Sequence, residues 1–209
     1  MGQIIKFPVQ ASKLGYKRVR RRATPADHQH QLDLFPRPSA QILSFVSGLS
    51  PFEQALMLDE RGEEQAAELY ARAIDEHDCI ADAHCNLGII ESQKGNTAKA
   101  LDRFTASLKH DPRHAESHYN LGNLYFEVND LRLAQIHYEM AVELEPSFPN
   151  VYFNLGLVQA INNDLGAAVS SLNKYQELVP AEEGRIAGEL LETLKKSLAA
   201  AKNSGYGSA

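Results

Sequence analysis

Residues 87–112, LGIIESQKGNTAKALDRFTASLKHDP, contain the pattern that decides the fold of this chain. The landmarks of this stretch return at intervals of 34 residues in both directions along the sequence. They are Leu-Gly at 87–88, 121–122 and 155–156; a small residue at Ala66, Ala100, Ala134 and Ala168; a large one at Tyr70, Phe104, Tyr138 and Leu172; and Pro112, Pro146 and Pro180. Several landmarks that share one period indicate an array of structural repeats.

Each repeat is predicted to form two helices. The stretch DAHCNLGIIESQK, residues 82–94, has apolar residues at helical spacing and ends before Gly95, which suits the C-terminus of a helix. The second helix begins at Thr97, a capping residue, and closes before Pro112, which cannot continue it. A lone helical pair cannot bury its apolar face, so neighbouring pairs must stack and share a core.

These residues resemble the tetratricopeptide repeat family over about residues 49–180. The resemblance implies an all-α, helix-turn-helix solenoid, with four units over residues 46–180 and a capping helix over residues 181–202. The first unit departs from the pattern, since it lacks Leu-Gly and has Asp78 in place of proline. Residues 203–209 are predicted to be a frayed C-terminus. Ile186, Leu190, Leu191, Leu194 and Leu198 form the apolar face of the capping helix.

The resemblance also implies a binding groove, because in this family the first helix of each unit lines a concave surface. An asparagine precedes each Leu-Gly, and its amide can pair with an extended peptide backbone without reading side chains. This pattern is similar to the asparagine-lined repeats of O-GlcNAc transferase. The predicted peptide-binding residues are Asn86, Asn120, Asn154, Asn123, Tyr119, Phe126 and Phe153. The alternative is that the asparagines pack or cap within the repeats.

One binding mode of the family is disfavoured by the residues at the corresponding positions. The chaperone-binding members grip a C-terminal carboxylate with lysine and arginine. The positions here are Asp82, Cys85, Glu116, Tyr119, Asn150 and Phe153, and none of them is basic. We therefore expect the groove to repel an acidic C-terminal tail.

Residues 1–45 contain four prolines and no sustained periodicity, so this tail is predicted to be largely disordered. It holds eight lysines and arginines against two aspartates, whereas the rest of the chain is strongly acidic. The basic run Lys17, Arg18, Arg20, Arg21 and Arg22 could bind DNA or RNA through phosphates. The alternative is an arm that solubilises the chain or docks on its own acidic repeats.

The tail also contains QLDLF, residues 31–35, which resembles the bacterial sliding-clamp-binding pentapeptide. By this resemblance Leu34 and Phe35 would enter the hydrophobic pocket of the clamp, with Leu32 beside them and Gln31 at the rim. The alternative is that the apolar residues cap the exposed face of the first repeat. If this pentapeptide binds a sliding clamp, the chain is a DNA-associated adaptor.

The sequence contains no phosphate-binding loop, nucleophile elbow or His-Glu-x-x-His motif, so we predict a non-enzymatic scaffold without a cofactor. A metal-dependent function at His110, His114 and His118 is an alternative, but packing roles are expected for these histidines, and no metal site is predicted. Two cysteines favour a reducing, cytoplasmic location. No run approaches the roughly 20 apolar residues that span a membrane, so no membrane partner is expected.

Overall fold

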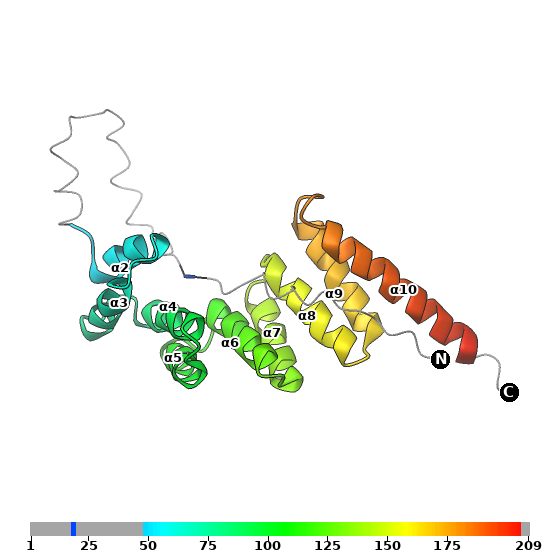
Figure 1. Ribbon diagram of the computed structural model, residues 1–209, viewed down its shortest axis with the longest axis horizontal. Coiled ribbons are helices and arrows are strands. Elements are labelled where there is room, and N and C mark those ends of the chain that lie inside the picture. The colour runs from blue at the N-terminus through cyan, green and yellow to red at the C-terminus, as the bar shows by residue number, and fades with distance from the viewer. Residues whose placement is uncertain (1–17, 20–47, 206–209) are drawn as a thin grey trace, which may run out of the picture. The chain divides into compact units, whose positions relative to one another are not determined.

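The computed structural model describes residues 18–19 and 48–205, and in this part of the chain all regular structure is α-helical. The chain divides after Pro112 into two compact units, which are described separately. The N-terminal unit contains α2 (Pro51–Glu60), α3 (Ala66–Asp75), α4 (Ile80–Gln93) and α5 (Thr97–His110). The C-terminal unit contains α6 (Ala115–Glu127), α7 (Leu131–Leu144), α8 (Pro149–Ile161), α9 (Leu165–Leu178) and α10 (Arg185–Gly205) (Figure 1).

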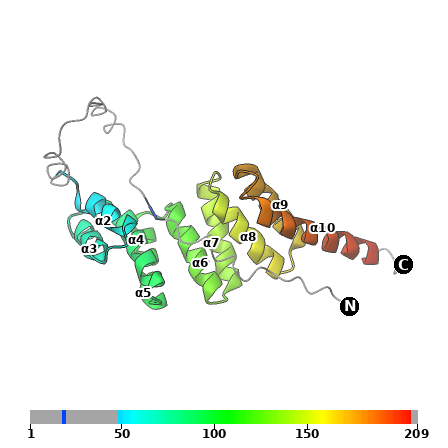
Figure 2. The ribbon, with the colours of Figure 1, turned by 45° about the horizontal axis from the view of Figure 1, so that its top comes forward.

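Successive helices of each unit form hairpins, namely α2–α3, α4–α5, α6–α7 and α8–α9 (Figure 2). The turn within each hairpin contains one residue in the left-handed region of backbone conformation. These residues are Gly62 (φ 72°), Gly95 (φ 77°), Asn129 (φ 62°) and Asn163 (φ 63°). Glycine and asparagine tolerate this conformation better than other residues do. The sequence therefore supplies one suitable turn residue per repeat.

The Leu-Gly landmark is explained by the packing of the two helices in a hairpin. A Cβ atom on Gly88 would lie 2.6 Å from Cε1 of Phe104, which is fully buried. A Cβ atom on Gly122 would lie 2.5 Å from the ring of Tyr138, and one on Gly156 would lie 2.8 Å from Leu172. Glycine is thus required in the first helix because the large residue of the second helix packs directly against its backbone.

The first repeat departs from the pattern, but it still forms both of its helices. Ser50 and Glu53 make a reciprocal capping box at the start of α2. Asp78 accepts a hydrogen bond of 2.8 Å from the backbone N–H of Phe52, so the residue that replaces the expected proline satisfies another group at this helix start. Phe52 in turn packs on Tyr70, with 5.7 Å between the ring centroids.

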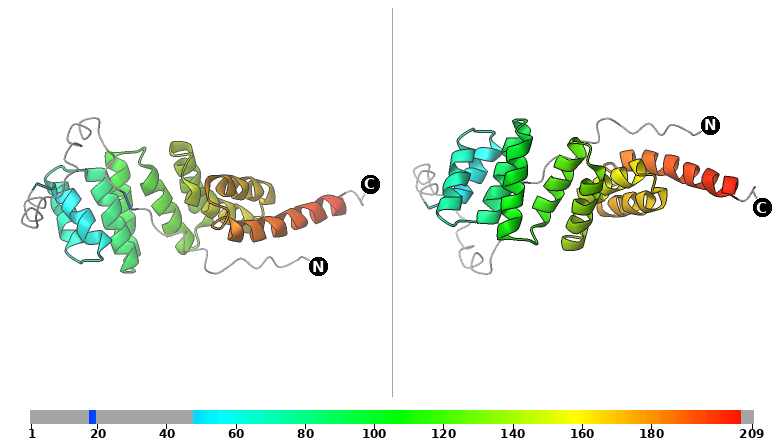
Figure 3. Two further views of the ribbon diagram at one scale, coloured as in Figure 1. Left: turned by 90° about the horizontal axis from the view of Figure 1, so that it is seen from above. Right: turned by 90° about the horizontal axis from the view of Figure 1, so that it is seen from below.

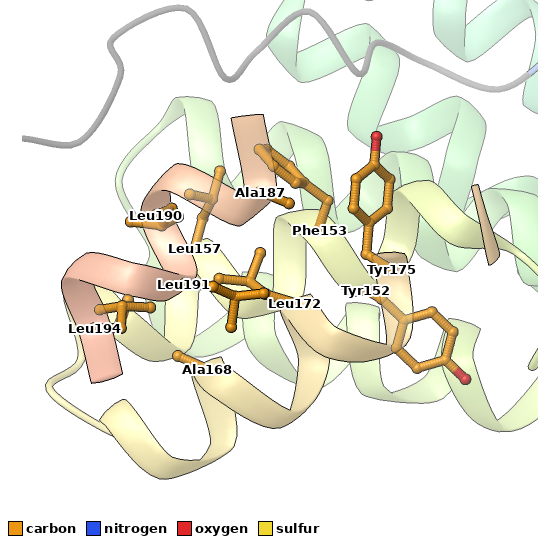
Figure 4. Packing of buried hydrophobic residues seen from close by; sticks show 11 residues of the cluster. Tyr152, Phe153, Leu157, Ala168, Leu172, Tyr175, Ala187, Leu190, Leu191 and Leu194 are labelled. Atoms are coloured by element: carbon orange, nitrogen blue, oxygen red, sulfur yellow. The ribbon is translucent and has the colours of Figure 1, made fainter. Parts of the chain in front are cut away.

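Helix α10 covers the last hairpin. Its residues Ala187, Leu190, Leu191 and Leu194 are buried with residues of α8 and α9, including Tyr152, Phe153, Leu157, Ala168, Leu172 and Tyr175 (Figure 4). Ile186 lies off this face and is 53% exposed, and Ala187 takes the buried position instead. The helix begins at Arg185 and continues to Gly205, past the predicted end at 202, and its C-terminal end extends beyond α9 (Figure 3).

No helix in the described ranges is both long enough and apolar enough to span a lipid bilayer.

Candidate functional site

The N-terminal unit holds a two-residue segment from the start of the chain, Arg18–Val19, beside α4 (Figures 1 and 2). The backbone N–H of Val19 donates to Oδ1 of Asn86 at 2.9 Å, and Nδ2 of Asn86 donates to the carbonyl oxygen of Val19 at 3.1 Å. Asn86 is fully buried, and the side chain of Val19 is 3% exposed. One amide therefore satisfies both backbone groups of a residue that lies 67 positions away in sequence.

This pairing imitates an antiparallel β-ladder. In extended backbone the N–H and C=O of one residue point to the same side, and an opposite residue can exchange both hydrogen bonds with them. The Asn86 side chain supplies the same donor and acceptor from a helix. Such an arrangement holds a peptide by its backbone and makes no demand on its sequence.

A buried carboxylate also lies beside the segment. Asp59 is 4% exposed and shares the buried face of α2 with Phe52 and Ala55. Nε of Arg18 approaches Oδ2 of Asp59 at 2.7 Å, in an ion pair rather than an in-line hydrogen bond. Nη2 of Arg18 also donates to Oε1 of Gln93 at 3.4 Å. The side chain of Arg18 is 34% exposed, so this ion pair is partly open to solvent on the arginine side.

Tyr70 connects the carboxylate to the amide. Its hydroxyl donates to Oδ2 of Asp59 at 3.2 Å and accepts from Nδ2 of Asn86 at 3.1 Å. Burial, followed by the charge of Asp59, raises the pKa of Tyr70, so the hydroxyl stays neutral and keeps its proton for donation. The network runs from α2 through α3 to α4 and ends on the backbone of Val19.

The electrostatics of Asp59 depend on the bound arginine. Burial raises the pKa of the Asp59 carboxyl, while the guanidinium of Arg18 and the hydroxyl of Tyr70 act in the opposite direction. A buried charge that loses its partner costs about 1–3 kcal/mol or more. The site therefore favours a cation in the position that Arg18 occupies.

The C-terminal unit uses its asparagines differently. Nδ2 of Asn154 donates to Oδ1 of Asn123 at 2.8 Å and makes a longer contact of 3.4 Å with the hydroxyl of Tyr119. The hydroxyl of Tyr138 donates to the same Oδ1 of Asn123 at 2.8 Å. The contacts of Asn154 join neighbouring repeats, and the Tyr138 contact lies within one repeat. All are of the kind expected if the asparagines pack within the array.

The remaining predicted groove residues of this unit are also largely buried. Tyr119 is fully buried in a cluster with Tyr138 and Phe148, and Phe126 is half-buried against the same cluster. Phe153 packs on Tyr175, with 5.2 Å between the ring centroids. Asn120 has no exposed surface. Among the described residues, Asn86 pairs with the backbone of a residue that is distant in sequence.

The predicted tail sites lie mostly outside the described residues. These are Gln31, Leu32, Leu34 and Phe35 of the clamp-like motif, and Lys17, Arg20, Arg21 and Arg22 of the basic run. Arg18 is described, and its contact is with Asp59 rather than with solvent alone. This contact is of the kind that the alternative of a self-docking arm expects.

The histidines have structural contacts. The His114 ring caps α6, where its Nδ1 accepts from the backbone N–H of Ser117 at 3.1 Å. Nδ1 of His118 lies 3.1 Å from Nδ1 of His137, and His110 stacks on His84 with ring centroids 5.7 Å apart. Over the described ranges no group of three or more His, Cys, Asp or Glu residues is arranged to hold a metal ion.

Sequence reasoning missed Asp59, the role of Tyr70 in the site, and Gln93. Asp59 had a detectable signal, because Phe52, Ala55 and Asp59 follow the spacing of one helix face and a charged residue therefore falls on the apolar stripe. Gln93 lies seven residues after Asn86, on the same side of α4. Tyr70 was predicted only as a packing residue of the repeat.

Comparisons with known proteins agree with this architecture. Family models described as tetratricopeptide repeat match residues 115–148 and residues 85–131. No curated protein sequence matches the chain.

Similar solved structures include two TPR domains and MamA. The first TPR domain of Spaghetti (RPAP3), bound to the HSP90 peptide SRMEEVD, is 23% identical, with a TM-score of 0.53 over 57% of this chain and 93% of that one. The first TPR domain of human RPAP3 is also 23% identical, with a TM-score of 0.52 over 59% and 96%. MamA is 19% identical, with a TM-score of 0.54 over 73% and 96%.

The fold thus defines a helical-hairpin repeat protein, a class of interaction modules. Within that class, residues 85–148 match the tetratricopeptide repeat family, and the period of 34 residues along the sequence agrees with these matches.

Proposed function

We propose that this chain is a non-enzymatic protein-interaction scaffold whose repeats hold a peptide in extended conformation. The observation that carries the proposal is the double hydrogen bond between the Asn86 amide and the backbone of Val19. A helix that satisfies both backbone groups of a distant segment of its own chain supports a peptide-binding role for this surface. Main-chain hydrogen bonds of this type provide affinity, while neighbouring pockets provide specificity.

The similar structures support an interaction role without defining the ligand. The Spaghetti domain is bound to a peptide that ends in two glutamates, a valine and an aspartate. The N-terminal unit of this chain presents the buried carboxylate of Asp59 beside its amide. Like charges disfavour each other at short range, so we do not expect this site to accept an acidic peptide of that kind.

A peptide selection tests the proposal. Because Val19 already occupies the amide of Asn86, the selection uses the full chain with Arg18→Gly and Val19→Gly, exposed to a randomised dodecapeptide display library. We expect enriched peptides whose affinity falls about tenfold or more on Asn86→Ala, the cost of losing two hydrogen bonds. Asn96→Ala is the matched control, since Asn96 is exposed and lies in the same unit.

A second measurement is independent of any change in the protein. Each backbone nitrogen of one selected peptide is methylated in turn, which removes a single N–H donor. A peptide held by an asparagine amide loses most of its affinity at the one position that pairs with it. The proposal is wrong if no peptide is enriched, or if neither Asn86→Ala nor any N-methylation weakens the selected peptides.

The alternative of a DNA-associated adaptor depends on residues 17 and 20–35, which lie outside the described ranges. Clamp docking and nucleic-acid binding therefore stay predictions from sequence, and they are compatible with a scaffold whose repeats bind a further protein.

A further inference from the structure

The site in the N-terminal unit selects side chains as well as backbone. Nε and Nη2 of Arg18 contact two different partners, the carboxylate of Asp59 on α2 and the amide oxygen of Gln93 on α4. A guanidinium presents several N–H groups in a fixed plane, whereas the lysine ammonium is a single point of charge. One arginine therefore spans the two helices with two separate nitrogens, whereas a lysine would have to contact both residues through its single nitrogen.

The carboxylate is held in place before any ligand arrives. Asp59 lies on the buried face of α2, and the hydroxyl of Tyr70 donates to it. Tyr70 is itself fully buried and packed on Phe52. The acceptor for a guanidinium is thus built into the core of the hairpin, which distinguishes it from the solvated acidic residues elsewhere on the repeats.

The next residue of the segment is selected for being apolar. The side chain of Val19 is 3% exposed, and both of its backbone groups are paired with Asn86. A charged side chain in the same place would be desolvated without a partner, which is strongly unfavourable. The segment therefore satisfies three requirements in two residues: a guanidinium, a backbone whose N–H and C=O both pair with one amide, and a buried aliphatic side chain.

We infer that Asp59, Tyr70, Asn86 and Gln93 form a recognition site for an extended peptide in which arginine precedes a small aliphatic residue, and that Arg18–Val19 occupies this site as a built-in competitor of a partner protein. The inference rests on the proposed function, and it adds the class of ligand and a means of regulation. A partner with such a dipeptide would displace the chain's own segment.

Competition from Arg18–Val19 should weaken the apparent affinity for an external peptide by a measurable factor. A segment on the same chain acts at an effective concentration on the order of millimolar when its connection can reach the site. The apparent affinity for an external ligand falls by the fraction of molecules in which the site is free. A site occupied in about nine molecules of ten therefore binds a peptide about tenfold more weakly than an empty one.

The test uses the fluorescein-labelled peptide GYKRVRR, which is residues 15–21 of this chain. Its binding is followed by fluorescence anisotropy at about 0.15 M salt, where long-range attraction is screened. The full chain is compared with the full-length variant that carries Arg18→Gly and Val19→Gly. We expect the variant to bind the peptide about tenfold more tightly, because its site is empty.

Two charge-matched controls separate recognition from general attraction to an acidic protein. In the peptide, Arg18→Lys keeps the charge but loses the bridge to Gln93, and Val19→Gly keeps the charge but loses the buried side chain. In the variant protein, adding Asp59→Asn removes the carboxylate while leaving an acceptor for Tyr70, and adding Glu60→Gln removes an exposed charge from the same helix. Both peptide changes and Asp59→Asn should weaken binding about tenfold, and Glu60→Gln should not.

Equal binding by the full chain and the variant, or equal binding of GYKRVRR and its charge-matched forms, would overturn the inference. Failure of this inference can be distinguished from failure of the proposed function by the library selection. Selected peptides that depend on Asn86 but lack an arginine–aliphatic pair would leave the proposed function standing and refute the ligand class. If no peptide of any sequence binds, both fail.

Discussion

Replacing Gly122 by alanine should destabilise the C-terminal unit, although alanine is the better helix former. A Cβ atom at this position would lie 2.5 Å from both Cδ1 and Cε1 of Tyr138. Ordinary contacts between carbon atoms begin near 3.5 Å, so the ring or the helix backbone must move by about 1 Å. Tyr138 is 1% exposed, and its hydroxyl donates to Asn123, so the ring has no free direction in which to move.

The magnitude follows from three contributions. Overpacking of a core costs about 1–3 kcal/mol. Loss of the hydrogen bond from Tyr138 to Asn123 adds about 1 kcal/mol. The higher helix propensity of alanine returns up to about 1 kcal/mol. Gly122→Ala should therefore lower the free energy of unfolding by about 1–3 kcal/mol. For a unit of this size each kcal/mol corresponds to roughly 4–8 °C in the unfolding midpoint.

Thermal unfolding followed by circular dichroism measures this difference. Gly166→Ala is the matched control, because Gly166 also lies in a helix of this unit and the nearest atom to its added Cβ, Oδ1 of Asp164, is 3.9 Å away. In a Tyr138→Ala background the methyl group would enter the vacated space, so Gly122→Ala should then be neutral or stabilising. The packing explanation is wrong if Gly122→Ala is as stable as Gly166→Ala. It is also wrong if Gly122→Ala lowers the free energy of unfolding by the same amount with and without the Tyr138 side chain.

Three further predictions address a turn, a buried histidine and the tail. Gly95→Ala should lower the free energy of unfolding by about 1 kcal/mol, because φ at this position is 77°; urea unfolding that shows no loss would contradict this. Burial and the neighbouring histidine lower the pKa of His137 to about 4. The unfolded chain then binds more protons between about pH 6.5 and 4, so stability falls by about 2–3 kcal/mol as the pH drops through this window. His137→Gln should flatten that slope in urea titrations, and an unchanged slope would refute the assignment. Calorimetric titration of a peptide of residues 26–40 into a bacterial sliding clamp tests the tail motif. Binding of micromolar affinity that is lost when Leu34 and Phe35 are both changed to alanine would support docking. If no heat of binding is detected, docking through this motif is excluded.

The period of 34 residues determined the class of fold from sequence alone. A repeat that returns the same small, large and turn-forming residues can bury its apolar faces only by stacking on its neighbours. The C-terminal ends of α4 and α5 also follow from local signals, because Gly95 takes a left-handed conformation and Pro112 cannot extend a helix. The start of α5 differs from the prediction, because Asn96 rather than Thr97 is its N-cap residue. The reason for the glycine in Leu-Gly needed tertiary structure, since its neighbour Phe104 comes from the next helix.

The candidate site was only partly accessible to sequence reasoning. Asn86 could be proposed because an amide before each Leu-Gly repeats with the period. Its equivalent Asn154 has the same sequence context, yet it hydrogen-bonds to Asn123, a residue of the preceding repeat. The position within the repeat therefore determines where an asparagine lies, whereas the neighbouring residues determine what that asparagine binds.

Only the tertiary structure decided that Arg18 and Val19 contact residues of α2 and α4, which Tyr70 of α3 connects. Asp59, Tyr70 and Asn86 are separated by 11 and 16 residues along the chain, and Val19 by 67 from the amide that holds it. Local sequence signals reflect helix propensity, capping and periodicity, which act over a few residues. A buried ion pair and a backbone held by a side chain arise from distances in space, so the sequence by itself determined the scaffold and the folded chain determined the site.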